Sequence, residues 1–167
     1  MSLGMPRGRP LMLDTNLAVL LFVGLADIGL IEKHQRLGRF DARDFLILKN
    51  IAESASKLVV APYVAAETSN LARDKRDIGI AARNRISEIM RAHFTIAAEA
   101  YVECAAAVKD EKFAELGVTD SALLCILQIN KALHLLTDDH ALSQIGLSRK
   151  LKVHNFNHIR DQRDDFR

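Results

Sequence analysis

Four short acidic segments most constrain what this chain can fold into, because each stands where an apolar strand ends or a helix is expected to begin. They are residues 11–16 (Leu-Met-Leu-Asp-Thr-Asn), 66–71 (Ala-Glu-Thr-Ser-Asn-Leu), 117–122 (Gly-Val-Thr-Asp-Ser-Ala) and 135–140 (Leu-Leu-Thr-Asp-Asp-His). Carboxylates gathered in one place repel one another, so a protein that brings them together must protonate some of them or supply a cation. The pattern therefore favours a fold that gathers these segments around a metal ion.

The composition is that of a soluble globular protein with one domain. Of the 167 residues, 49% are hydrophobic and 26% are charged, which suffices for a buried core. Gly24 and Asp27 break the longest apolar run, and residues 1–10 lack an apolar stretch, so neither a membrane span nor a signal peptide is expected. Cys104 and Cys125 lie in apolar helical stretches, which favours buried, reduced thiols and a cytoplasmic protein.

The net charge of +2 hides a basic surface. The motifs single out four acids: Asp14, Glu67, Asp120 and Asp139. Without these four, 17 of the 21 acidic residues remain against 23 basic residues, a balance of +6. An acidic pocket in a basic surface suits a phosphodiester substrate. Three bases after the second acidic segment are candidate RNA contacts, although a solvated helix face would explain any one of them equally well: Arg73, Lys75 and Arg76.

Short apolar strands alternate with amphipathic helices along the chain. Strands are expected at residues 11–13, 58–60, 94–96, 134–137 and near Val153, and helices at 15 onward, 27–56, 62–73, 77–92, 98–109, 119–130 and 139 onward. Because helices separate the strands, the expected fold is α/β, with a central parallel sheet covered by helices on both faces. The domain is expected to span residues 11–157, between an N-terminal tail (1–10) and a charged C-terminal tail (158–167).

This architecture would bring the acids together. Ligands of parallel α/β sheets bind at the carboxyl ends of the strands, and Asp14 and the pair Asp138–Asp139 come just after such ends. Asp120 is expected at a helix start, and helix starts lie at the same edge because helices return antiparallel to the strands. Glu67 lies about one turn into its helix and reaches the same edge with a longer side chain.

Each acid alone also has a simpler explanation. An Asp at a helix start, such as Asp120, is commonly a cap or a partner of the helix dipole. An acid after a strand, such as Asp14, is often a turn residue, and Glu67 alone would be a solvated helix residue. The four together favour a common site, because four independent caps need not face one edge.

In order, the motifs resemble those of PIN-domain proteins. The likeness consists of Asp-Thr-Asn at 14–16 after an apolar strand, Glu67 with Asn70, Thr-Asp-Ser-Ala-Leu-Leu at 119–124, and Leu-Leu-Thr-x-Asp at 135–139. It covers most of residues 11–155, and although each motif alone is weak, four in order are a strong signal. The chain departs from the family at Leu142, where an aromatic residue is common, and in residues 25–57, which are longer than in compact members.

The resemblance implies an endoribonuclease that depends on a divalent metal, with products carrying 5′-phosphate and 3′-hydroxyl ends. Many small bacterial members are VapC-type toxins paired with a cognate antitoxin, and PIN-like proteins often form homodimers. By motif, the catalytic and metal-binding residues would be Asp14, Glu67, Asp120 and Asp139. Asn16 and Thr137 would support the site, and Asn70, three residues after Glu67 on one helical face, would hydrogen-bond that carboxylate.

The adjacent acids Asp138 and Asp139 are expected to have different roles. Consecutive side chains on a helix diverge by about 100°, so only one of the two would face the metal pocket. The spacing from Thr137 selects Asp139, which leaves Asp138 as an outward supporting residue that favours the helix start electrostatically.

The donor set of the motifs indicates the cation. Carboxylates without Cys or His select hard ions, Mg²⁺ or Mn²⁺ rather than zinc, and such an ion activates water for attack on phosphorus. A metal-free ribonuclease would need a His or Lys base, but His140 is the only histidine next to an acidic residue of these segments. A haloacid-dehalogenase-like phosphatase would need a second Asp where the chain has Asn16, and a two-component receiver would need an acidic pair by its first strand. The remaining alternative is a non-catalytic PIN-like scaffold that binds RNA or protein.

Overall fold

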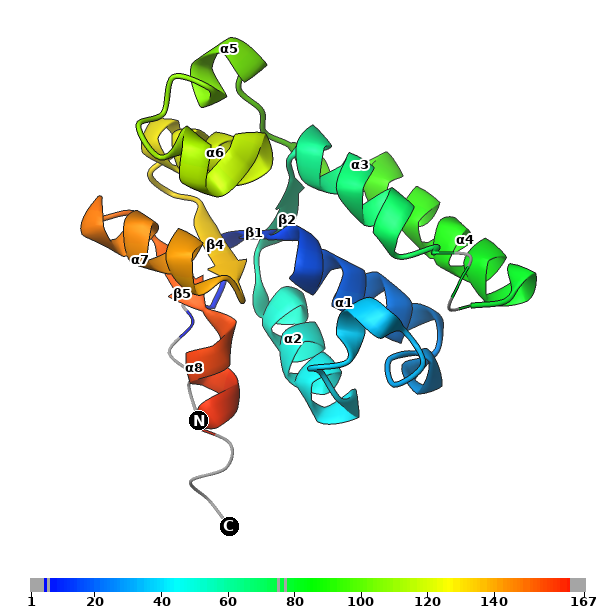
Figure 1. Cartoon of the computed structure of the whole chain (residues 1–167). Helices are drawn as coiled ribbons and strands as arrows, with labels where there is room; N and C mark the ends of the chain where they lie inside the picture. The colour runs from blue at the N-terminus through cyan, green and yellow to red at the C-terminus, as the bar shows by residue number, and fades with distance from the viewer. Residues whose placement is uncertain (1–4, 6, 75, 77, 163–167) are drawn as a thin grey trace.

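The strands of the computed structural model form one parallel sheet in the order β3-β2-β1-β4-β5 (Figure 1). The structure describes residue 5 and residues 7–74, 76 and 78–162. The strands are β1 Pro10–Leu13, β2 Lys57–Val60, β3 Ala98–Glu99, β4 His134–Thr137 and β5 Val153–Asn155. The expected fold class, α/β with a parallel sheet between layers of helices, is confirmed.

Helices cover both faces of this sheet. Figure 1 shows α1 to α4 on one side and α6 and α7 on the other. The helices are α1 Thr15–Ala26, α2 Ala42–Ser54, α3 Pro62–Leu71, α4 Ile80–Ile96, α5 Cys104–Ala107, α6 Phe113–Ile129, α7 His140–Ser148 and α8 Phe156–Asp161. Two short 3₁₀ helices, η1 Ile28–Leu30 and η2 Gln35–Leu37, connect α1 to α2. Among the described residues, no helix is long and apolar enough to span a membrane.

The strand order creates a switch point between β1 and β4. From β1 the chain adds β2 and β3 on one side, and then returns to add β4 and β5 on the other. Right-handed crossovers put the helices of the two halves on opposite faces, so the halves diverge beyond the carboxyl ends of β1 and β4, the place where parallel α/β sheets bind ligands. The register places Leu13 beside Leu136, which brings the residues after the two strands to the same level.

Helix α1 forms the centre of the core on one side of the sheet. It is apolar around most of its surface, and Leu17, Leu20 and Val23 are fully buried. Gly24 lets α2 approach closely, since a Cβ at this position would lie 2.2 Å from Cδ2 of Phe45. A helix held on all sides gives a rigid base to the residues at its start, and these residues belong to the first acidic segment.

Two sequence predictions about secondary structure are wrong. Residues 94–96 are the last turn of α4 rather than a strand, because Phe94 packs edge-on against Phe22 of α1 with ring centroids 5.3 Å apart. The strand comes two residues later, as β3. The helix expected at 98–109 is reduced to α5. A short apolar run does not distinguish a strand from a buried helical turn.

The predicted domain limits also need correction. The limit at residue 157 falls inside α8, where Ile159 is buried and Nη2 of Arg160 pairs with Oδ2 of Asp44 at 2.9 Å. At the other end, Met5 is buried in the core although it was assigned to the N-terminal tail. Cys104, expected to be buried, is exposed because it begins the short surface helix α5.

Candidate functional site

The ends of β1 and β4 meet through a shared carboxylate. The backbone N–H of Asp14 donates to the carbonyl of Leu136 at 3.1 Å, which continues the pairing of the two strands past their ends. In return, the N–H of Asp138 donates to Oδ2 of Asp14 at 3.0 Å. The first and fourth acidic segments therefore lie together at the switch point of the sheet.

Asp14 is both the cap of α1 and a buried acid. Its Oδ1 accepts from the N–H of Leu17 at 2.9 Å, and its Oδ2 also accepts from the hydroxyl of Thr137. Burial raises the pKa of Asp14 to about 8, with the charge of Asp138 as the next cause, and the hydrogen bonds only partly oppose this rise. The sequence offered a turn residue as the simple explanation for Asp14, whereas the structure makes it the N-cap of α1, and neither role accounts for this high pKa.

Thr137 connects the fourth segment to Asp14. The residue is fully buried, and its hydroxyl oxygen accepts a hydrogen bond of 2.9 Å from the N–H of Asp139 while its proton goes to Asp14. One side chain therefore fixes the carboxylate after β1 and the backbone that starts α7.

The expected orientation of Asp138 is wrong. Asp138 is only 3% exposed, whereas Asp139 is exposed and caps α7, its Oδ1 accepting from the N–H of Leu142 at 2.8 Å. The helical spacing failed because Asp138 still follows the direction of β4, so the two side chains are not successive positions of one helix. Oδ1 of Asp138 accepts from Nδ2 of Asn16 at 3.2 Å, so Asn16, predicted to support the site, lies at the switch point.

Glu67 bridges two other acidic segments. Its Oε2 accepts from the hydroxyl of Thr15 at 2.8 Å, and its Oε1 accepts from the hydroxyl of Thr119 at 2.7 Å. Thr15 starts α1 and Thr119 lies in α6, so the exposed carboxylate of α3 joins the first and third segments. The threonines stand next to Asp14 and Asp120 in the sequence, but their partner could not be read from the sequence.

Asp120 lies on α6 just after a kink. Residues 113–129 consist of two helices that meet at a kink at Gly117, where φ is 79°. Asp120 therefore lies near the start of the second helix, as expected, although the Thr119 hydroxyl donates to Glu67 and does not act as the cap. Burial, followed by the charges of Asp139, Glu67 and Asp138 in that order, raises the pKa of Asp120 to about 7. Three other carboxylates therefore act on Asp120, from α3 and from the end of β4.

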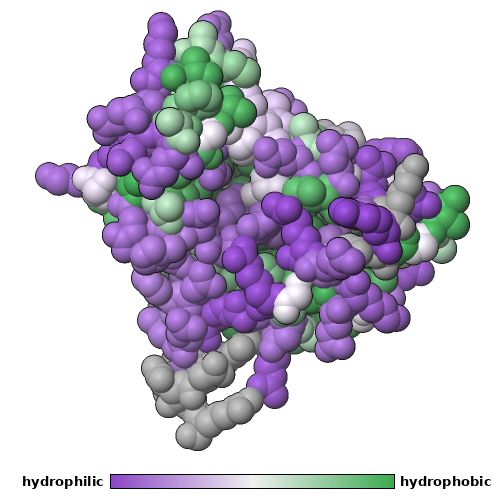
Figure 2. Space-filling model, in the orientation of Figure 1, coloured by the Kyte–Doolittle hydropathy of each residue, from purple (hydrophilic) through white to green (hydrophobic). Residues whose placement is uncertain are grey.

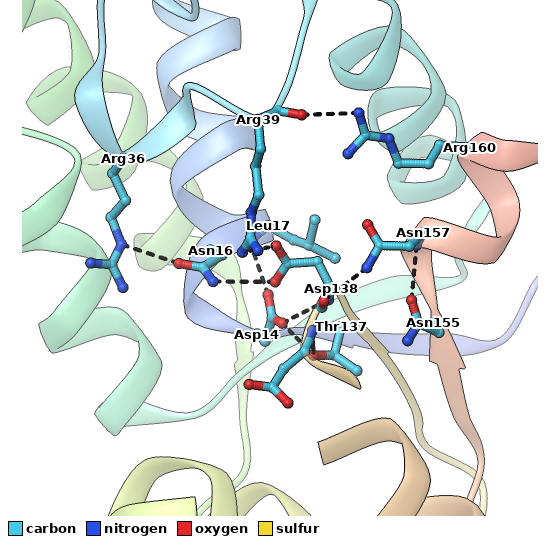
Figure 3. Close-up of polar contacts among 11 residues, drawn as sticks. Asp14, Asn16, Leu17, Arg36, Arg39, Thr137, Asp138, Asn155, Asn157 and Arg160 are labelled. Atoms are coloured by element: carbon cyan, nitrogen blue, oxygen red, sulfur yellow. Dashed lines mark hydrogen bonds and ion pairs between the residues drawn. The ribbon is translucent and has the colours of Figure 1, made fainter. Parts of the chain in front are cut away.

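The acids form two groups with Asp138 between them. Asp14 is affected by Asp138, whereas Asp120 is affected by Asp139, Glu67 and Asp138. The counterion of Asp138 was not predicted from the sequence. Oδ2 of Asp138 pairs with Nη2 of Arg39, which comes from the segment between η2 and α2 (Figure 3). This irregular segment has no periodic pattern that could have identified Arg39.

Asn70, Arg73 and Arg76 have surroundings other than the four acids. Asn70 and Arg73 line a hollow of about 580 Å³ between α3 and α4, together with Arg83. Nη2 of Arg76 pairs with Asp74 at 2.6 Å, and Lys75 lies outside the described residues. The expected hydrogen bond from Asn70 to Glu67 is not formed, and Glu67 is held by the two threonines instead. The hollow is polar, as is the surface over the centre of the molecule, whereas apolar side chains gather over α5 at the top (Figure 2).

The donor set fits a hard, hydrated cation. Glu67 and Asp120 come from the two helices α3 and α6, and Asp14 and Asp139 follow the ends of β1 and β4. Their carboxylates retain lone pairs beyond those used in hydrogen bonds. Within the described part of the chain, no group of three or more His, Cys, Asp or Glu side chains is ready-made to hold an ion. Mg²⁺ does not need such a cage, because it keeps several waters and binds through one or two carboxylates together with substrate phosphate.

Comparisons of this chain with models of protein families, with curated proteins and with solved structures find no match. The likeness of its motifs to PIN-domain proteins therefore stays a prediction. The function of the site rests on its geometry and chemistry.

Proposed function

We propose that this protein is a ribonuclease that depends on Mg²⁺ or Mn²⁺ and hydrolyses RNA phosphodiester bonds. One observation carries the proposal: acids from four distant segments converge at the switch point of a parallel sheet, and the pKa values of two of them, Asp14 and Asp120, are raised to about 8 and 7. Carboxylates that raise one another's pKa at the switch point of a sheet are an arrangement that a divalent cation relieves. Perturbed pKa values in a crevice also favour a functional site over four separate caps.

In this proposal Asp14, Glu67, Asp120 and Asp139 hold the cation. When bound, the ion lowers the pKa of a water molecule and stabilises charge on the phosphate oxygens. The rest of the chemistry is positioning by the chain. Thr137 and the N–H of Leu17 fix Asp14, and the carboxylate of Asp139 is fixed by the N–H of Leu142.

The threonines give Glu67 a defined position although the side chain is exposed. With both oxygens accepting hydroxyl protons, at 2.8 Å from Thr15 and 2.7 Å from Thr119, the carboxylate cannot rotate freely. A ligand held in place loses less conformational entropy when the ion binds. Asn16 similarly orients Asp138 through a hydrogen bond of 3.2 Å.

We further propose that the protein is the toxin of a cytoplasmic toxin–antitoxin pair. The support is the PIN-like motif order at residues 14–16, 67–70, 119–124 and 135–139. The partner would be a cognate antitoxin, and the active form could be a homodimer. A short reading frame for a DNA-binding protein directly upstream, whose product co-purifies with this chain and stops cleavage, would support this assignment. Absence of such a neighbour in the genome would contradict it.

The competing function is a PIN-like scaffold that binds RNA or protein without cutting. One observation favours it: Arg39 already neutralises Asp138 within the acidic cluster. An assay with purified protein separates the two functions. Single-stranded RNA is incubated with Mg²⁺, with Mn²⁺ or with EDTA, and the ends of the products are mapped. The nuclease gives fragments with 5′-phosphate and 3′-hydroxyl ends only when a divalent ion is present. Intact RNA under all three conditions would contradict the nuclease function and favour the non-catalytic scaffold.

A further inference from the structure

Two arginines reach from the segment between α1 and α2 over the acidic edge of the sheet. Arg36 lies in η2, and Arg39 follows it just before α2. Figure 3 shows both side chains extending toward Asn16 and Asp138. The segment belongs to residues 25–57, the part of the sequence whose length departs from compact PIN-like proteins.

Arg39 has more hydrogen-bonding capacity than its partner uses. Its Nη2 pairs with Oδ2 of Asp138, whose side chain is fully buried, whereas 54% of the Arg39 side chain is exposed. A guanidinium carries five N–H donors in a rigid, planar fork. The pair with Asp138 engages one nitrogen, so the half-exposed fork can present other donors to the solvent at the edge of the acidic cluster.

The backbone and ring next to Arg39 are firmly held. Nη2 of Arg160 donates to the carbonyl of Arg39 at 2.9 Å, and the same nitrogen pairs with Oδ2 of Asp44, a fully buried side chain. The guanidinium groups of Arg39 and Arg160 both lie over the ring of Phe40, 5.3 Å and 5.4 Å from its centroid. Helices α2 and α8 therefore fix the backbone that carries Arg39, so its side chain is delivered to one place.

Arg36 brings a second positive charge to the same spot. Its Nε donates to Oδ1 of Asn16 at 3.1 Å, and Asn16 in turn donates to Asp138. The amide oxygen of Asn16 is uncharged, so this contact orients Arg36 without neutralising it. Arg39 thus contacts the buried carboxylate directly, whereas Arg36 is linked to it through Asn16, so the carboxylate has its counterion without Arg36.

We propose that Arg36 and Arg39 form a phosphate-binding site for single-stranded RNA beside the acidic cluster. The inference rests on the proposed ribonuclease function and names the contacts that bring its substrate to the site. The acidic cluster alone repels a polyanion, and fixed arginine forks next to it offset this repulsion where a phosphate must approach. Arg is the side chain whose geometry matches phosphate oxygens in a bidentate manner.

Binding without cleavage tests the inference. The affinity for a short fluorescein-labelled single-stranded RNA is measured by fluorescence anisotropy in EDTA over a range of KCl concentrations. Each phosphate contact contributes roughly 0.7 to the slope of log K against log salt concentration for a single strand. Arg36→Gln should reduce the slope by about 0.7, and Arg36→Gln/Arg39→Gln by about 1.4.

Arg36→Gln keeps the test decisive if loss of Arg39 unfolds the protein, because the single contact of Arg36 with Asn16 is at the surface. Lys49→Gln is the matched control. Lys49 also pairs with a carboxylate, Glu53 at 3.7 Å, but it lies well along α2, about 10 Å from the start of that helix along its axis. Its slope should equal that of the wild type.

The outcomes separate this inference from the proposed function. Wild-type slopes in Arg36→Gln and the double variant overturn the inference, even if the protein cleaves RNA with Mn²⁺. A wild type that does not bind RNA also overturns it, as does an equal decrease in Lys49→Gln. Reduced slopes in the two arginine variants support the phosphate site, and they do so even if no cleavage is found, in which case only the nuclease proposal fails.

Discussion

The N–H of Asp138 donates to the carboxylate of Asp14 over 3.0 Å, so the residue after β4 holds the carboxylate after β1 in place. Together with the bonds from Leu17 and Thr137, this contact engages both oxygens of Asp14. Asp14 is consequently a structural element of the switch point as well as a candidate metal ligand. Asp120, in contrast, faces other carboxylates, and this difference separates the two acids in experiment.

Asp14→Asn and Asp120→Asn should both abolish cleavage but change stability in opposite directions. An Asn at position 14 presents N–H₂ where one oxygen now accepts, and an unsatisfied buried donor costs about 1–3 kcal/mol. An Asn at position 120 removes a charge that Asp139 and Glu67 repel, so the metal-free protein should become more stable above pH 7. Urea unfolding in EDTA measures both changes. Equal destabilisation by the two variants would contradict the assigned environments.

The free energy of unfolding of the metal-free protein should fall as the pH rises from about 6.5 to 8. Asp14 and Asp120 titrate near 8 and 7 in the folded protein but near 3.8 when unfolded, so the folded state binds more protons throughout this range. Each protonated carboxyl contributes a slope of up to about 1.4 kcal/mol per pH unit. Stability gained by these raised pKa values is present at lower pH and is lost as the pH passes the folded pKa.

Buried His134 and half-buried His154 change the stability with pH in the opposite direction, which sets the lower limit of the pH range for this test. Burial lowers the pKa of His134 to about 4 and also lowers that of His154, so these groups stabilise the fold as the pH rises toward 6.5 and not beyond it. Above this value the two carboxyls dominate. Denaturation series at several pH values between 6.5 and 8 should therefore show a smaller decrease for Asp120→Asn than for the wild type. A variant with the wild-type slope would show that Asp120 does not titrate in this range.

The sequence predicted the architecture because short apolar runs and their alternation with helices depend on local patterns. The strands around Leu11 and Leu135 follow from hydrophobicity alone. Phe94 was misassigned because its role in α4 comes from a contact with Phe22, distant in the sequence. Local patterns do not contain such contacts.

The candidate site was predictable in its residue types but not in its connections. Motif order pointed to Asp14, Glu67 and Asp120, yet the threonine partners of Glu67 are 52 residues away on either side. Asp138 was placed outward because a helical rotation was applied to a residue that still belongs to the strand end. Arg39 lies in an irregular segment, where hydrophobic periodicity gives no information.

Asp139→Asn should reduce cleavage at least about tenfold while leaving stability almost unchanged, because Asn caps a helix about as well as Asp. Asp138→Asn should instead leave most of the cleavage activity and reduce the stability. It removes the charge that pairs with Arg39 and places an amide in a fully buried position, which costs about 1–3 kcal/mol. Rates at saturating Mn²⁺ and urea midpoints for both variants give the comparison. A larger loss of cleavage in Asp138→Asn would identify Asp138 as the ligand instead.

Mn²⁺ should raise the melting temperature if the folded acidic cluster binds it. An ion present at about 100 times its Kd stabilises the folded state by roughly 2.7 kcal/mol. The rise should be larger at pH 8 than at pH 6.5, because protons on Asp14 and Asp120 compete with the ion. Asp14→Asn/Asp120→Asn should abolish the rise. A melting curve that millimolar Mn²⁺ does not change would favour the scaffold.

The rate of RNA cleavage at saturating Mn²⁺, measured for the wild type and for Asp120→Asn purified in parallel, tests the central claim most directly. Asp120 is suited to this comparison because the structure assigns it the neighbouring charges of three carboxylates, so its replacement should leave the fold intact. We expect divalent-dependent cleavage by the wild type and a loss of roughly a hundredfold or more in the variant, since a ligand to the ion supplies several kcal/mol of transition-state stabilisation. Equal rates for the two proteins, or cleavage by both in EDTA, would contradict the account.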